Sequence, residues 1–152
     1  MKIMSWMYAL LFTFVLFCDR ITKYIALISW QEPVILNKFC ALNLVYNRGI
    51  SWGMLASDTK SGFLAVFLIT SAVFALVIYH ARQQWLAGKN IFGEVLVIAG
   101  AFSNLIDRIY YHHVIDFIHC GYGSFVWPTF NVADTAIFFG ACIMLIQMMR
   151  ES

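Results

Sequence analysis

Four apolar stretches without a charged residue alternate with shorter polar segments along the chain. They cover residues 3–18, 61–81, 95–106 and 135–149. Only the second matches the about 20 apolar residues that a helix needs to cross about 30 Å of hydrocarbon, and the others reach that length only by extending past a charge. The pattern therefore predicts one membrane domain over residues 1–152, with transmembrane helices at about 4–28, 62–80, 91–109 and 132–149.

Residues 30–60 form the longest segment between the predicted helices, and their middle part, 39–47, mixes strand-forming residues with a weak alternation. This pattern favours an all-α membrane protein with a small extramembrane β segment between its first and second helices. The first apolar stretch, preceded by Lys2, is also typical of a cleaved signal peptide, but no small-x-small cleavage site follows it. We therefore expect it to be the first transmembrane helix.

The composition supports a membrane protein and excludes several other classes. Hydrophobic residues make up 62% of the chain and charged residues only 12%, against about 25% charged residues in a soluble domain. Such a chain has too little polar surface to cover a soluble globule of this size. The net charge of +2 is small and scattered, so we expect no nucleic-acid partner.

Each of the three shorter apolar stretches is bounded by an aspartate: Asp19, Asp107 and Asp134. Counted at about 1.5 Å per residue from the cation at the opposite end of each span, these aspartates lie about 24 to 27 Å across the membrane. In antiparallel helices all three gather near one face, and a carboxylate at that depth indicates a functional site. The other face carries the cations of the termini and of one loop, which are Lys2, Arg82, Lys89 and Arg150. The positive-inside rule places that face in the cytoplasm on the strength of these residues, although the raw count of cations on the two faces points the other way.

Two asparagines each precede an aspartate by three residues, which places amide and carboxylate on one helix face. Asn131 and Asp134 fit either a helix cap or a functional pair, because both residue types satisfy free N–H groups in a first turn. In the other pair, formed with Asn104, Asp107 lies at the far end of its helix, where the dipole opposes a negative charge. An ion pair between Asp107 and Arg108 explains that position better.

Asp116 stands between β-branched and aromatic neighbours, unlike the charge of a solvated loop. By itself it fits a structural role. Paired with Asp134 it fits catalysis, since two carboxylates held close in a desolvated site cannot both ionise. One then acts as the base for a water molecule and the other as the acid for the leaving group.

Metal chemistry fits the chain less well than acid–base chemistry. His112, His113, His119 and Cys120 are near one another in sequence, but the chain has neither a His-Glu-x-x-His nor a Cys-x-x-Cys pattern. We therefore predict neither a metal nor another cofactor.

Two further pairs of residues are suggested by spacing. Lys23 follows Asp19 by four residues, so an ion pair between them is expected on a helix. Among the four cysteines only Cys40 and Cys120 fall in exposed segments on one side of the membrane, where a disulfide is an open alternative.

Five blocks, in order and spacing, resemble the motifs of bacterial lipoprotein signal peptidase, signal peptidase II: Asp19-x-x-x-Lys23, Asn47-Arg48-Gly49, Gly100-x-x-x-Asn104-x-x-Asp107-Arg108, Val114-Ile115-Asp116-Phe117 and Phe130-Asn131-x-Ala133-Asp134. The resemblance implies a four-span membrane aspartyl endopeptidase that removes the signal peptide from diacylglyceryl-modified prolipoproteins, cutting before the lipidated cysteine. It also implies a bacterial inner-membrane protein with both termini in the cytoplasm and its active site near the outer face. Membrane lipids and the family's cyclic peptide inhibitors are further implied partners.

The same resemblance implies which residues form the site. Asp116 and Asp134 correspond to the catalytic pair, with no metal. Supporting or substrate-binding roles fall to Asp19, Lys23, Asn47, Arg48, Gly49, Asn104, Asp107, Arg108 and Asn131.

Three departures from the family pattern bear on substrate preference and inhibitor affinity. Arg20 stands where the family usually has Gln, and Ile50 with Trp52 enlarges a segment that is usually small. Ala101 and Ser103 replace the usual glycines before Asn104. Both catalytic acids are present, so we expect activity.

Two alternatives from other functional classes stay open at this point. One is a non-catalytic binder of lipoprotein precursors. The other is a small proton-coupled membrane transporter, for which acids inside the membrane are equally expected.

Overall fold

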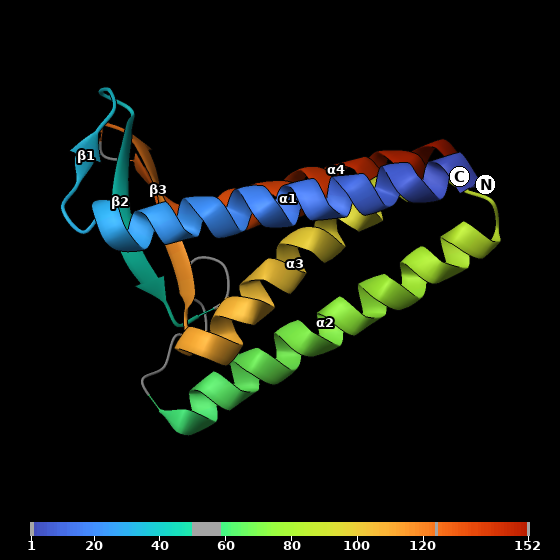
Figure 1. Cartoon of the computed structure of the whole chain (residues 1–152), viewed down its shortest axis with the longest axis horizontal. Helices are drawn as coiled ribbons and strands as arrows, with labels where there is room; N and C mark the ends of the chain where they lie inside the picture. The colour runs from blue at the N-terminus through green and yellow to red at the C-terminus, as the bar shows by residue number, and fades with distance from the viewer. Residues whose placement is uncertain (1, 50–58, 124, 152) are drawn as a thin grey trace.

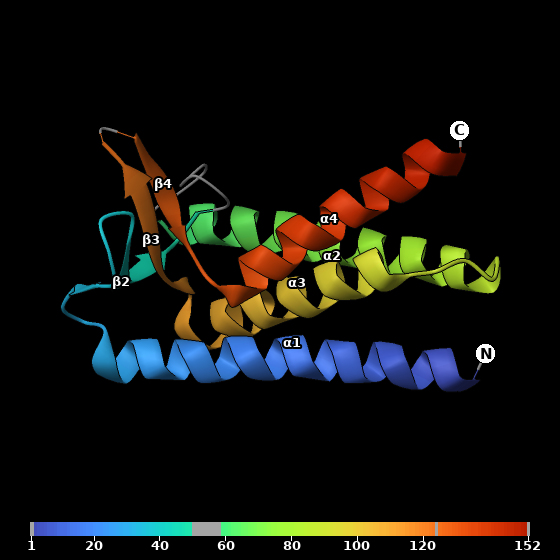
Figure 2. The same cartoon turned by 90° about the horizontal axis from the view of Figure 1, so that it is seen from above.

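Four helices run along the long axis of the protein in the computed structural model, which describes residues 2–49, 59–123 and 125–151. They are α1 (Lys2–Ser29), α2 (Lys60–Leu86), α3 (Phe92–Tyr111) and α4 (Val132–Glu151). Both chain ends lie at one end of the molecule and a small sheet lies at the other (Figure 1). The view in Figure 2 shows the same separation of the sheet from the chain ends.

Two of the described helices are long and apolar enough to cross a membrane by themselves, over Lys60–Leu86 and Val132–Arg150. Only 6% of the apolar stretch of α2 is buried inside the protein, so most of its hydrophobic side chains are at least partly exposed, as in a helix that borders lipid. The sequence pattern had singled out only the second helix. The stretch in α4 also qualifies, because Asp134 and Arg150 lie in its first and last turns.

The sheet contains four antiparallel strands in the order β1 (Val34–Ile35), β2 (Cys40–Asn47), β3 (Val114–Tyr122) and β4 (Phe125–Phe130). The prediction of β structure between the first two helices is confirmed by β1 and β2. It missed β3 and β4, which lie between α3 and α4. The first four residues of β3 are all buried, so this strand shows no alternation of apolar and polar positions in the sequence.

Strand β3 is fixed to α1 by a buried apolar cluster. Ile115 and Phe117 pack with Ala26, and the rings of Trp30 and Phe117 lie 5.1 Å apart between centroids. Because side chains alternate along a strand, Asp116 projects from the opposite face of β3. The cluster therefore holds Asp116 at the junction between the sheet and the helices.

Helices α3 and α4 approach each other closely through glycines. A Cβ added to Gly100 would lie 2.4 Å from the carbonyl oxygen of Ala133, and one added to Gly140 would lie 2.6 Å from that of Gly93. Small residues at such contacts are typical of helices packed within a membrane. This packing brings the middle of α3 against the first turn of α4.

Gly100→Ala should push α3 and α4 apart, because the new methyl group would overlap a backbone oxygen. We expect a loss of about 1–3 kcal/mol in the free energy of unfolding. The loss would appear as a lower thermal unfolding temperature of the purified protein in detergent. Ala75→Val, which adds methyl groups at an exposed position of α2, is the control. Equal unfolding temperatures for the two variants would contradict the close packing.

Candidate active site

Lys23 is a buried cation at the centre of a polar network between the helices. Only 1% of its surface is exposed. Its Nζ lies 2.8 Å from Oδ2 of Asp19 and 2.7 Å from Oδ2 of Asp107, and it donates a 2.8 Å hydrogen bond to Oδ1 of Asn104. The predicted pair of Asp19 and Lys23 is confirmed, and the ammonium group joins α1 to α3.

Asp19 extends this network to α4. Its Oδ1 accepts a 2.8 Å hydrogen bond from the backbone N–H of Ala133, which is one of the free donors at the start of that helix. Its Oδ2 accepts a 2.6 Å hydrogen bond from Oγ of Ser103. Ser103, a departure from the family pattern, thus supplies a hydroxyl group to a fully buried carboxylate.

The predicted ion pair between Asp107 and Arg108 is wrong. Asp107 pairs instead with Lys23 and with Arg20, whose Nη2 lies 2.5 Å from Oδ1 of Asp107. The Arg108 side chain donates a 2.6 Å hydrogen bond to the carbonyl oxygen of Gly49. Adjacent residues of a helix project in different directions, which explains why the two side chains find separate partners.

Asn131 and Asp134 form a reciprocal cap at the start of α4. The N–H of Asp134 donates to Oδ1 of Asn131 over 2.8 Å, and the N–H of Asn131 donates to Oδ2 of Asp134 over 3.3 Å. The cap leaves Oδ1 of Asp134 to accept a 2.8 Å hydrogen bond from Nδ2 of Asn104. It also leaves the Asn131 amide to donate to Oδ1 of Asp116 over 2.7 Å. The capping interpretation is confirmed, and the same residues link two carboxylates.

Asp116 is a buried carboxylate with two amide partners. It is 1% exposed, and Nδ2 of Asn47 donates a 2.9 Å hydrogen bond to its Oδ2. Burial, and then the negative charge of Asp134, raise the pKa of Asp116 to about 7, while the hydrogen bonds from Asn47 and Asn131 and the charge of Lys23 oppose the rise. Asp116 therefore holds a proton at pH values where an ordinary aspartate is ionised.

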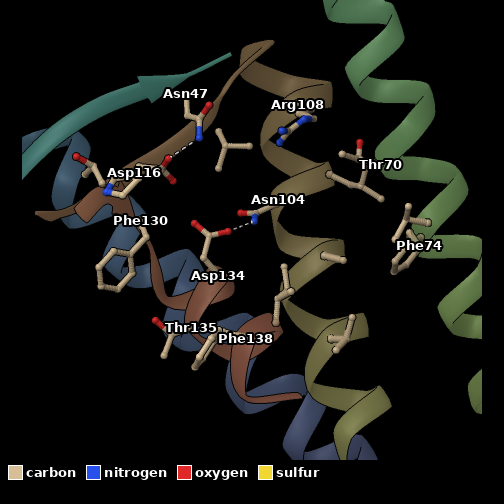
Figure 3. Close-up of a pocket in the computed structure, with 18 of the residues that line it drawn as sticks. Asn47, Thr70, Phe74, Asn104, Arg108, Asp116, Phe130, Asp134, Thr135 and Phe138 are labelled. Carbon is tan, nitrogen blue, oxygen red and sulfur yellow. Dashed lines mark hydrogen bonds between the residues drawn. The ribbon is translucent and has the colours of Figure 1, made fainter. Parts of the chain in front are cut away.

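Both carboxylates line a cavity of about 1100 Å³. Figure 3 shows Asp116 and Asp134 on one side of this cavity, with Asn104 and Arg108 projecting from α3 and Phe74 from α2. Further along, its walls are mainly apolar and come from α2, α3 and α4, including Val73, Val77, Val97, Ile137 and Phe138. The cavity thus joins a polar end, which can hold a peptide bond, to an apolar groove.

The histidines do not gather around a common point. His119 lies 3.3 Å from the hydroxyl group of Thr129, and His112 ends α3 with a left-handed backbone conformation. In residues 2–49, 59–123 and 125–151, no group of three or more His, Cys, Asp and Glu side chains could hold a metal ion. The expectations at Ile50 and Trp52 concern residues outside the described ranges.

Comparison with known sequences identifies the family. The family model of signal peptidase (SPase) II matches residues 11–150. The chain belongs to the signal peptidase II family. It is 37% identical to the lipoprotein signal peptidase of Janthinobacterium sp. (strain Marseille), covering 88% of this chain and 82% of that relative. It is 34% identical to the lipoprotein signal peptidase of Thermodesulfovibrio yellowstonii, covering 90% of each chain.

Two solved structures are similar to the chain over most of its length. A bacterial membrane enzyme determined by the in meso method at 2.3 Å resolution is 26% identical and matches with a TM-score of 0.79, covering 95% of this chain and 88% of that one. A second bacterial membrane enzyme, determined at 1.9 Å resolution, is 27% identical with a TM-score of 0.74 and covers 96% and 94% of the two chains. The chain therefore shares its fold with these two bacterial membrane enzymes.

The structure brings the nine supporting residues named from the sequence to one end of the helices, around Asp116 and Asp134. Arg48 lines the cavity, and the N–H of Gly49 donates a 2.9 Å hydrogen bond to Oδ1 of Asn47. Arg20 and Ser103 were named from the sequence as departures from the family pattern but were not included among the supporting residues. Their positions in the sequence could have indicated this role, because Arg20 directly follows Asp19 and Ser103 lies about one helical turn before Asp107.

Lys23→Met should destabilise this signal peptidase II strongly, because it would leave the buried carboxylates of Asp19 and Asp107 without their shared cation. Breaking a buried ion pair by removing one partner costs about 3–5 kcal/mol. Arg20→Gln is the matched control: Arg20 is partly exposed, and Lys23 still neutralises Asp107 in its absence. Thermal unfolding should show a much larger loss for Lys23→Met. A larger loss for Arg20→Gln would contradict the central place of Lys23.

Proposed function

We propose that this signal peptidase II is an aspartyl endopeptidase in which Asp116 and Asp134 activate water to cut the substrate's peptide bond. The observation that carries the proposal is the position of Asn131, which donates from its side chain to the carboxylate of Asp116 and from its backbone N–H to the carboxylate of Asp134. Both acids also line the same cavity. A substrate that enters this cavity can therefore reach both carboxylates, one carried by a strand and the other by the first turn of a helix.

The pair of acids shares one proton at neutral pH in this proposal. The raised pKa of Asp116, about 7, keeps a proton on the pair, while Asp134 lies in the first turn of α4, where the helix dipole favours a negative charge. The ionised carboxylate takes a proton from water as it attacks the scissile carbonyl carbon, and the protonated acid supplies the proton that the leaving amine needs.

The neighbouring polar residues orient the acids and the peptide. Asn104 accepts from Lys23 and donates to Asp134, so its amide has one fixed orientation. Asn47, at the end of β2, orients Asp116 by donating a hydrogen bond to its carboxylate. Arg108 lines the cavity between the two acids and Gly49, where its charge can balance that of the ionised carboxylate.

We further propose that all four helices span the membrane as one domain, with the sheet and the active site near the outer face. In this arrangement three charged residues in the second half of α1 face α3 rather than lipid, because Asp19, Arg20 and Lys23 are paired with one another or with Asp107. Both chain ends lie away from the sheet, which matches termini in the cytoplasm (Figure 1).

The substrate in this proposal is a diacylglyceryl-modified prolipoprotein, cut before its lipidated cysteine. The relatives are lipoprotein signal peptidases, and the apolar groove between α2 and α4 suits an apolar signal peptide helix that enters sideways from the lipid. Phe74 and Phe138 line this groove, in which the family's cyclic peptide inhibitors would compete with the substrate.

Replacing either acid of the pair should stop cleavage. Asp116→Asn keeps the size of the side chain but removes the titratable proton, so we expect turnover of a diacylglyceryl-modified precursor to fall by on the order of 10³-fold. Glu94→Gln is a matched control, because Glu94 is an equally buried acid at the far end of α3. It should keep its activity, and both variants should unfold near the wild-type temperature.

Near-normal turnover by Asp116→Asn would contradict the assignment of the pair. The same assay should include the unlipidated form of the precursor. Equal cleavage of both forms would remove the lipid from the proposed recognition while leaving the aspartyl chemistry in place.

The pH dependence of cleavage should follow the proton on Asp116. As pH rises through about 7 the pair loses this proton, and kcat/KM should fall. The hydrogen bond from Asn47 stabilises the ionised form and so lowers the pKa of Asp116. Asn47→Ala should therefore move the alkaline limb of the pH profile to higher pH, whatever its effect on the maximal rate. Gln84→Ala, a change at a half-buried position of α2 outside the cavity that the two acids line, should leave the limb in place. An unmoved or lowered limb in Asn47→Ala would be evidence against this role.

A further inference from the structure

Two cysteines face each other across strands β2 and β3. Cys40 and Cys120 are direct partners in the strand register, although they lie 80 residues apart in sequence. Their sulfur atoms are 2.8 Å apart. This separation is well inside the about 3.5–4.0 Å of an ordinary contact between heavy atoms.

The position of this pair in the ladder suits a covalent bond. The N–H of Gly121 donates a 2.8 Å hydrogen bond to the carbonyl oxygen of Phe39, which makes Cys40 and Cys120 a non-hydrogen-bonded pair. Facing Cα atoms in such pairs are about 4.5 Å apart, and a disulfide needs a separation of about 4.4–6.8 Å. The backbone therefore needs no rearrangement for a bond to form.

We propose that Cys40 and Cys120 form a disulfide in the mature protein. The proposal rests on the orientation given under the proposed function, which places the sheet outside the cytoplasmic membrane, where disulfides persist. It does not rest on the catalytic assignment of Asp116 and Asp134. Cys18 and Cys142 belong to α1 and α4 and stay as thiols.

The bond forms by exchange with the disulfide of a protein or small-molecule thiol oxidant. The contact with the Cys40 sulfur, together with burial, raises the pKa of Cys120 to about 11, so little of Cys120 is thiolate at neutral pH. The Cys40 thiolate bonds to one sulfur of the oxidant and releases the other as a thiol. Cys120 then attacks the Cys40 sulfur and releases the second thiol. The two cysteines lose two electrons and two protons, and the oxidant's disulfide becomes two thiols.

The bond would clamp the two strands that carry the residues around Asp116. Asn47 stands at the end of β2 and Asp116 lies in β3, so the disulfide limits sliding of one strand past the other. It also closes a loop that contains α2 and α3. Cross-links across long loops restrict the unfolded chain most, which predicts a clear effect on stability.

Differential alkylation tests the bond in cells. Cells that express the full chain are quenched in acid, and the denatured protein is alkylated with a light maleimide, reduced, and alkylated with a heavy one. We expect heavy label on Cys40 and Cys120 and light label on Cys18 and Cys142. A second sample that is alkylated but not reduced should give a linked peptide that contains residues 40 and 120. Light label on all four cysteines would overturn the proposal. The result should be the same in Asp116→Asn, which separates it from the catalytic proposal.

Thermal unfolding with and without reductant is the second measurement. Reduction should lower the unfolding temperature of the wild type by about 5 °C or more, and should leave the Cys40→Ser/Cys120→Ser variant unchanged. Cys142→Ser is the control and should keep the wild-type response. An equal response of the wild type and the double variant would overturn the proposal. Thiols that are free in cells and oxidise only after purification would also overturn it, and would place the sheet in a reducing compartment.

Discussion

The ammonium group of Lys23 sets the arrangement of the helices, because an apolar interior cannot hold an unpaired charge. Its three partners are Asp19 on the same helix and Asp107 and Asn104 on α3. Asp19 in turn accepts a hydrogen bond from the first turn of α4. Three helices are thus joined through one buried cation, and the position of Asn104, the hydrogen-bond donor to the proposed catalytic pair, depends on that cation.

The same hydrogen bonds serve the fold and the proposed chemistry. Asn131 caps α4 and also donates to Asp116, so a change at Asn131 would affect both the start of the helix and the pair of acids. Asp116 comes from a strand that is anchored to α1 by Ile115 and Phe117, and Asp134 comes from a helix. Because one acid belongs to a strand and the other to a helix, the two carboxylates keep a fixed relative position, which a pair that shares one proton requires.

The sequence predicted the helices and the gathering of carboxylates better than their partners. Apolar length and the rise of a helix suffice to bring Asp19, Asp107 and Asp134 to one end. They do not decide that Arg20 rather than Arg108 pairs with Asp107, because this choice depends on how α1 and α3 are rotated against each other. Strand β3 was missed because its first four residues are all buried, and so they lack the alternation of apolar and polar positions that marks a strand. One face of the strand packs on α1, and the other face borders the site. The choice of Asp116 and Asp134 came from resemblance to the family.

The central claim is that burial and mutual repulsion keep one proton on Asp116 and Asp134 at neutral pH. Infrared difference spectroscopy across a pH titration measures this directly, since a protonated carboxylic acid absorbs apart from an ionised carboxylate. The account predicts an acid band in the wild type that disappears as pH rises through about 7 and is missing from Asp116→Asn. A wild-type protein without this band below that pH, or an Asp116→Asn protein that keeps it in full, would contradict the account.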